Sequence, residues 1–157
     1  DSTQPGPGWG LALLSALDLD PARPIRLAGV VDLQPDEGAW VGLAVHNGEG
    51  NYREGGLAWY GSTLYLLVHA PCYVVNAGPV EPGARLLATE YHPAHGWRIT
   101  VDGVSRYSEP IDYRNNRLQG TPRPGLWAVN LRTESDRITG RVRALIGPIT
   151  VQQQPGP

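Results

Sequence analysis

From Ile25 to Val151, apolar and polar residues alternate in short segments that are separated by turn signals, and this pattern limits the fold more than any other feature. A period of two places successive side chains on opposite faces of a β-strand. The 157 residues include 20 glycines and 15 prolines, which is typical of many turns joining short strands. The sequence therefore predicts an all-β chain.

The segmentation also predicts the architecture. The clearest hairpin is "ITVDGVSRY", because Asp102 and Gly103 suit a two-residue type I′ turn. Many short antiparallel strands in one domain indicate a β-sandwich or jelly roll. The predicted strands are 25–33, 39–47, 52–60, 63–70, 72–77, 84–91, 97–101, 104–108, 125–131, 137–146 and 148–151.

The ends of the chain differ in composition from its middle. Residues 1–8 and 152–157 are rich in Pro, Gly and Gln and are predicted to be tails, which leaves 9–151 as the sandwich domain. Within that domain, "WGLALLSALDLD" allows a short helix, a strand or an irregular packing segment.

The alternation assigns a core face to each strand. These faces should pack against the partner sheet. The predicted core comprises Val41, Leu43, Val45, Leu57 and Trp59 (with Arg53 on their side), Leu64, Leu66, Val68, Trp97, Ile99, Val101, Trp127, Val129, Leu131, Ile138, Val142, Ala144 and Ile146.

Three stretches carry a family resemblance: "PIRLAGVVDLQPDEGAWVGLAVHNGEGNYREGGLAWYG", "GWRITVDGV" and "GRVRALIGPITV". Together they resemble the concanavalin A-like lectin/glucanase superfamily, with laminin-G-like and bacterial secreted modules nearest in character. The resemblance covers roughly residues 25–151 and implies an antiparallel jelly-roll sandwich. Members include lectins, glycan-binding and adhesion modules and glycoside hydrolases, so the resemblance does not fix the activity. The E-x-D-x-x-E pattern of the glucanases is not found on any predicted strand.

The face opposite the predicted core is rich in aromatic and polar side chains. Aromatic rings stack on the apolar C–H faces of sugars, while Glu and His hydrogen-bond sugar hydroxyls. The resemblance implies that a concave sheet is used in this way. The alternative is a half-exposed sheet coated by good strand formers. The candidate carbohydrate-binding residues are Trp40, His46, Tyr52, Glu54, Tyr60, Tyr65 and His69.

Metal and cofactor sites have weaker support. The loop "HNGEGNYRE" offers backbone carbonyls and the carboxylate of Glu49, which are oxygen ligands of the kind calcium prefers, but its Gly and Asn residues also suit an ordinary turn. His92 and His95 could meet a metal, although structural zinc needs four ligands. We therefore expect no cofactor and no metal site, with calcium as the alternative.

Two further groups of charged residues are candidates for a functional site. Hydrolysis of a glycoside needs two carboxyl groups about 5 Å or about 6.5–9.5 Å apart, and Glu54, Glu90, Asp102 and Asp112 are the candidates. An arginine group could bind an anionic polymer or could form a solvated outer face. That group comprises Arg132, Arg137, Arg141 and Arg143.

The charge and composition of the chain argue against two classes of partner, nucleic acids and membranes that it would span. The net charge of −2 argues against a nucleic-acid partner, and no apolar run has the ~20 residues that span a bilayer. Cys72 is the only cysteine, so no internal disulfide forms. The sequence predicts a non-catalytic, lectin-like module that binds a glycan or polysaccharide in an extracellular or cell-surface bacterial setting. The alternatives are a structural or adhesive module that self-associates and a small glycoside hydrolase.

Overall fold

The computed structural model describes residues 8–13, 17–35, 38–46, 52–70, 73–130, 133–134, 137–138 and 142–155. Within these ranges the regular structure is β-strand, apart from one turn of 3-10 helix, η1 (Tyr113–Asn115). The strands are β1 (Gly8–Leu13), β2 (Ile25–Leu33), β3 (Ala39–His46), β4 (Tyr52–Tyr60), β5 (Thr63–Ala70), β6 (Tyr73–Val80), β7 (Arg85–His92), β8 (Gly96–Val101), β9 (Val104–Glu109), β10 (Arg123–Asn130), β11 (Thr133–Glu134), β12 (Arg137–Ile138) and β13 (Ala144–Gln153).

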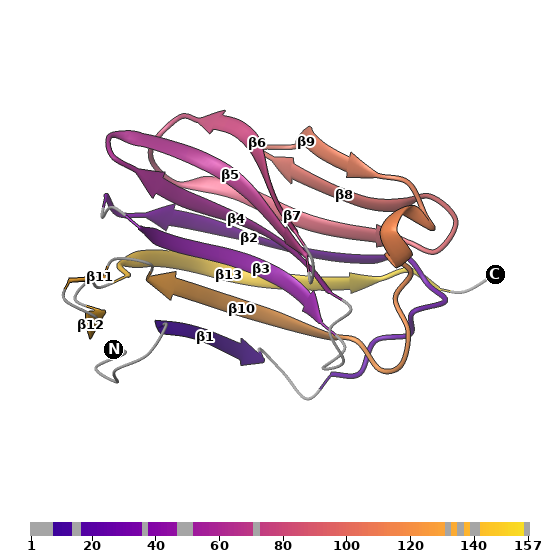
Figure 1. The fold of residues 1–157 in the computed structure, drawn as a ribbon. Helices are drawn as coiled ribbons and strands as arrows, with labels where there is room; N and C mark the ends of the chain where they lie inside the picture. Colours follow the sequence, from indigo (N-terminus) through magenta and orange to yellow (C-terminus); the bar gives the residue numbers. More distant parts are fainter. Residues whose placement is uncertain are drawn as a thin grey trace.

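The strands form two large antiparallel sheets that lie face to face (Figure 1). The six-stranded sheet has the order β1-β10-β3-β4-β5-β6, and the five-stranded sheet has the order β13-β2-β7-β8-β9. The short strands β11 and β12 pair only with each other. This arrangement confirms the predicted antiparallel β-sandwich, and the strand β1 resolves the choice that the sequence left open for the start of the domain.

The core between the sheets is built from the alternate residues that the sequence assigned to it. Val41, Leu43, Leu57 and Leu66 are at most 1% exposed, and Trp97 of the other sheet is equally buried. Burial of a Leu or Val side chain stabilises a fold by about 1.5–3 kcal/mol. The core prediction is therefore confirmed for β3, β4, β5 and β8.

The prediction was wrong for β10. Trp127 pairs with Gly42, and Val129 pairs with Trp40, so both lie on the outer face of the six-stranded sheet. Directly paired residues of antiparallel strands share a face, and the inward residues of β10 are therefore Leu126 and Ala128, which pack against the core.

The last strand also departs from the predicted pattern. A register shift between Ile146 and Ile149 changes which residues face inward. Val142 and Ala144 pack against the core as predicted, whereas Ile146 is 37% exposed. Ile149 and Val151 contact the core beyond the shift. An extra residue in a strand reverses the alternation that follows it.

The hairpin at Asp102 and Gly103 is confirmed. Both residues have positive φ, +51° and +78°, as a type I′ turn requires. The Asp102 carboxylate accepts hydrogen bonds from the Leu86 backbone N–H at 2.9 Å and from Arg85 at 3.1 Å, so the turn is tied to β7. No helix among the described residues is long and apolar enough to cross a bilayer.

Candidate functional site

The register of the six-stranded sheet brings all seven predicted site residues onto its outer face. Trp40 lies beside Ala58, which lies beside Tyr65. Two rows further along the same face, beyond the row of Gly42 and Gly56, Glu54 pairs with His69 across β4 and β5. His46 pairs with Tyr52 at the end of β3. The period of two therefore assigned this face correctly, and cross-strand pairing turns it into neighbouring side chains.

His69 lies at the centre of a hydrogen-bonded chain. Its Nδ1 is 2.9 Å from Glu54 Oε2, and its Nε2 is 3.3 Å from the Tyr52 hydroxyl. An ionised carboxylate only accepts, so Nδ1–H donates to Glu54 and Nε2 accepts from the tyrosine O–H. The chain fixes both the tautomer and the ring orientation of His69.

Burial shifts two titrating groups on this face. Glu54 is only 5% exposed, and burial raises the pKa of its carboxyl group, an effect that the hydrogen bond from His69 partly offsets. Burial also lowers the pKa of His46. His46 stacks on Tyr52 with ring centroids 5.0 Å apart. The partly exposed rim of the site therefore consists of His46, Tyr52 and His69.

Two tryptophans form the floor beside His69. The rings of Trp40 and Trp127 are 4.1 Å apart at 63°, and each lies 5.5 Å from the His69 ring. Both indoles are buried, at 6% and 5% exposure. The sequence had assigned Trp127 to the interior. Trp40 lies on the predicted face, but its indole is buried and packs against the rings of His69 and Trp127.

Two glycines make room for this floor. Gly42 and Gly56 pair directly with each other on the outer face. A Cβ at Gly42 would lie 2.7 Å from Trp127 Nε1, and one at Gly56 would lie 2.5 Å from Trp40 Nε1. The indoles therefore rest directly on the backbone, and their N–H groups have no hydrogen-bond partner among the described residues. The sequence signal for this close packing of the indoles was the presence of a glycine on each of two neighbouring strands, at positions that pair with each other.

Tyr60 and Tyr65 form a second part of the face. Their rings meet edge to face with centroids 6.0 Å apart. Tyr60 is 47% exposed, while Tyr65 is half-buried and packs against the tryptophan cluster. Tyr65 therefore links the exposed ring of Tyr60 to the floor made by Trp40 and Trp127.

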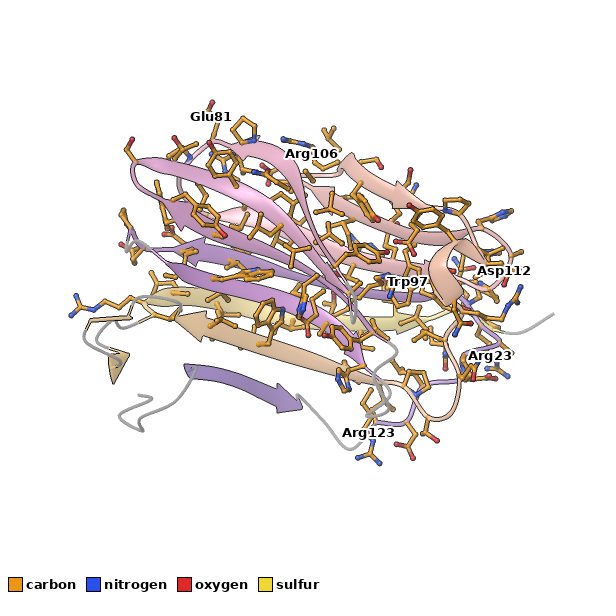
Figure 2. The ribbon with its side chains drawn as sticks, viewed as in Figure 1. Arg23, Glu81, Trp97, Arg106, Asp112 and Arg123 are labelled. Atoms are coloured by element: carbon orange, nitrogen blue, oxygen red, sulfur yellow. The ribbon has the colours of Figure 1, made fainter. Side chains whose placement is uncertain are left out.

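A buried polar network inside the sandwich was not predicted. Arg53, on the inward side of β4, donates through Nη2 to Glu109 Oε1 at 2.7 Å, and both side chains are at most 2% exposed. Tyr107 donates to Glu109 Oε2 at 2.7 Å, Asn116 donates to Oε1 at 2.5 Å, and the Tyr73 hydroxyl also donates to Oε2. The network joins the two sheets near η1, where Figure 2 labels Trp97.

The hydrogen bonds decide the charge of Glu109. Burial alone raises a carboxyl pKa, but donation from Arg53, Tyr73, Tyr107 and Asn116 outweighs it and lowers the pKa of Glu109. Burial and the bond to Glu109 raise the pKa of Tyr107. An arginine on the apolar side of a strand was the sequence signal for this network, because a buried guanidinium requires a buried anion.

The four candidate carboxylates are not gathered in one place. Glu54 faces outward from the six-stranded sheet, whereas Glu90 faces outward from the other sheet between Arg26 and Arg98. Asp102 sits in its hairpin, and Asp112 binds Arg117 beside η1. None of them therefore supplies a second carboxyl group to another within one described site.

The remaining predictions concern metals, the arginine group and the cysteine. His92 and His95 stack at 4.2 Å, but no group of three or more His, Cys, Asp or Glu residues gathers within the described ranges. Glu49, most of its loop and Cys72 lie outside the described residues. So do Arg132, Arg141 and the side chain of Arg137, while Arg143 is exposed.

Comparison with known proteins supports the fold. No protein-family model matches the chain, and no curated protein sequence is significantly similar to it. A carbohydrate-binding module from Bacillus subtilis, CBM66, is 10% identical, with a TM-score of 0.60 over 94% of this chain and 83% of that chain. A β-1,3-glucanase from Mycobacterium marinum is 15% identical, with a TM-score of 0.57 over 82% and 62%.

An alginate lyase from Pseudomonas aeruginosa is 9% identical, with a TM-score of 0.57 over 85% of this chain and 66% of that chain. The chain therefore spans less than two thirds of the glucanase and of the lyase. These likenesses confirm the predicted resemblance to the concanavalin A-like lectin/glucanase fold.

Proposed function

We propose that the chain is a non-catalytic carbohydrate-binding module and that the outer face of its six-stranded sheet binds a glycan. One observation carries the proposal: the exposed ring of Tyr60, the half-buried ring of Tyr65 and a hydrogen-bonded histidine lie on one face above a buried aromatic cluster. Three solved structures of similar fold are described as a carbohydrate-binding module, a glucanase and an alginate lyase, which favours a saccharide ligand.

The roles follow from exposure. Tyr60 is 47% exposed and offers its ring to the C–H face of a sugar, with Tyr65 holding it edge-on. His46 and Tyr52 are only partly buried and offer polar atoms to sugar hydroxyls, whereas His69, whose two ring nitrogens are hydrogen-bonded to Glu54 and Tyr52, holds the Tyr52 hydroxyl in place. Glu54 is a positioning residue, because it is buried and acts by orienting His69.

The expected affinity is modest. The polar contacts lie at a partly exposed rim and the stacking area is small, so we expect dissociation constants from micromolar to millimolar, equivalent to about −8 to −4 kcal/mol. Binding of this strength becomes useful when a polymer offers repeated sites. An extracellular or cell-surface setting, where polysaccharides are met, is part of the proposal.

Hydrolysis ranks below binding. The reaction uses two carboxyl groups that flank one glycosidic bond, and the candidates among the described residues are dispersed over both sheets and two turns. Self-association ranks below binding as well, because it gives no role to the Glu54–His69–Tyr52 chain.

The test is retention of polysaccharides in an affinity gel, with neutral and acidic polymers selected on a glycan array. Tyr60→Ala and Tyr65→Ala should each lower retention without unfolding the domain, since Tyr60 is exposed and Tyr65 packs only on the edge of the outer cluster, which leaves the core between the sheets intact. Tyr113→Ala is the matched control, because Tyr113 is similarly exposed at 44% but lies in η1. Retention that both site variants leave unchanged would overturn the proposal.

A further inference from the structure

The outer face of the five-stranded sheet carries a row of polar side chains that the proposed function does not use. The register pairs Gln152 with Arg26, Arg26 with Glu90, Glu90 with Arg98, and Arg98 with Ser108. These five residues cross all five strands, from β13 to β9, of the sheet that packs against the one carrying Tyr60 and Tyr65; Figure 1 shows the two sheets.

Glu90 holds the two arginines side by side. Arg26 Nε is 3.1 Å from Glu90 Oε1, and Arg98 Nε and Nη2 are 2.6 Å and 2.5 Å from Glu90 Oε2. Glu90 is 17% exposed, whereas the arginines are 38% and 59% exposed. Among the described residues, the two terminal amino groups of Arg26 and one of Arg98 have no partner.

This row forms one wall of a pocket of about 410 Å³. His92 and His95 stack at its other side, and Gln152 and Gln154 reach it from β13 and the segment that follows. Gly96, which pairs with His92, also lines the pocket. A Cβ at Gly96 would lie 2.0 Å from the Glu109 carbonyl, so the backbone there excludes every larger residue.

The pocket has the chemistry of an acidic sugar site. Two guanidinium groups outweigh one carboxylate, and a free guanidinium edge binds a carboxylate through paired N–H groups. Two amides, a serine hydroxyl and two imidazoles can hydrogen-bond the ring hydroxyls of the same molecule. The volume falls within the range of small-ligand pockets, roughly 300–1,000 Å³.

We propose that this pocket is a second binding site, separate from the tyrosine face, for the carboxylate-bearing residue of an acidic saccharide such as a uronic acid. Arg26 and Arg98 bind the carboxylate through the N–H groups that Glu90 leaves free. Gln152 and His92 bind hydroxyls. The inference does not rest on the proposed function, because the two sites lie on opposite sheets.

The test is a chemical-shift titration of the intact protein with galacturonate and glucuronate, followed at the side-chain amides of Gln152 and Gln154. Galactose and glucose test the need for the carboxylate, and acetate tests the need for the sugar. We expect saturable shifts with a uronate and much weaker shifts with the other three probes. Arg26→Gln and Arg98→Gln should each weaken uronate binding by about tenfold or more.

Two control variants separate this site from other effects. Arg85→Gln removes an arginine of the same sheet that binds Asp102 outside the pocket, and it should leave uronate binding unchanged. Tyr60→Ala should also leave it unchanged, so failure of the proposed function and failure of this inference give different results. Uronate shifts that are absent, that acetate reproduces at the same concentration, or that survive both pocket variants would overturn the inference.

Discussion

Glu109 and Glu54 are both buried, but their surroundings shift their carboxyl pKa values in opposite directions. Glu109 accepts hydrogen bonds from a guanidinium, two tyrosines and an amide, which lower its pKa. Glu54 has one histidine partner, and burial raises its pKa. The same residue type therefore anchors the interior in one place and orients a surface histidine in the other.

Replacing Glu109 with Gln should destabilise the protein by about 3–5 kcal/mol at neutral pH, because it leaves Arg53 as a buried charge without its counter-ion. The folded pKa of Glu109 lies below its ordinary value of 4.5. Its stabilising effect is therefore present above pH 4.5 and is lost as the pH falls through the folded pKa. Urea unfolding of both proteins between pH 3 and pH 7 should show the difference shrinking on acidification.

Glu54→Gln is the matched control, since it is the same substitution with the opposite expected trend. The folded pKa of Glu54 lies above 4.5, so the wild-type carboxyl group reduces stability progressively as the pH rises above 4.5 through the folded pKa. The free energy of unfolding of the variant, relative to that of the wild type, should therefore increase as the pH rises through this interval. A stability gap that moves in the same direction with pH for both variants would contradict the assigned environments.

For Arg53, the sequence predicted the face of the strand on which the side chain lies, but it did not predict the partner of that side chain. The period of two placed Arg53 on the core side with Leu57 and Trp59, and that placement is correct. Its partner Glu109 is 56 residues away on the other sheet, and alternation within one strand carries no information about pairing between sheets. Polar contacts of this kind follow from three-dimensional packing.

Among the elements, the hairpin between β8 and β9 supports a direct test. Asp102 accepts hydrogen bonds from the Leu86 N–H and from Arg85 while its own φ is +51°. Asp102→Ala removes both acceptors and leaves alanine in the left-handed region, and we expect a loss of about 1–3 kcal/mol in the free energy of unfolding. Urea unfolding at pH 7 measures this loss.

Asp102→Asn is the comparison variant. Asparagine tolerates positive φ and keeps one acceptor oxygen for the Leu86 N–H, so only the part of the contacts made with Arg85 is removed, namely its hydrogen bond and its ionic attraction. That part is small because the pair is exposed. Equal destabilisation by Ala and Asn would show that the charge of Asp102, and not the turn geometry, accounts for its contribution.

Strand boundaries were predicted well where turn residues separate the strands, and β2, β4 and β5 begin and end at the predicted residues. The strands predicted at 137–146 and 148–151 were wrong, because the structure has a short β12 followed by a β13 that runs through both segments. The inward face of β10 was assigned wrongly because apolar Trp127 and Val129 resemble core residues. They are buried as predicted, but in a second cluster with Trp40 on the outer face. A sheet with apolar side chains on both faces removes the contrast on which assignment by alternation depends.

The whole molecule presents different chemistry on its two outer faces. The six-stranded sheet carries the tryptophan cluster, Tyr60 with Tyr65, and the hydrogen-bonded chain through His69. The five-stranded sheet carries the pocket lined by Arg26 and Arg98. The packed core separates them, so a ligand on one sheet leaves the other accessible (Figure 1). A domain of this kind could contact two segments of polysaccharide at once and gain avidity from modest single sites.

A crystal structure of the protein with a bound oligosaccharide, taken from the polymers that the affinity gel retains, tests the central claim most directly. We predict a sugar ring stacked within about 4 Å of Tyr60 or Tyr65, the usual contact distance between apolar groups. Its hydroxyls should hydrogen-bond His46 or the Tyr52 hydroxyl. A saccharide bound only on the five-stranded sheet, with the tyrosine pair facing solvent, would contradict the account.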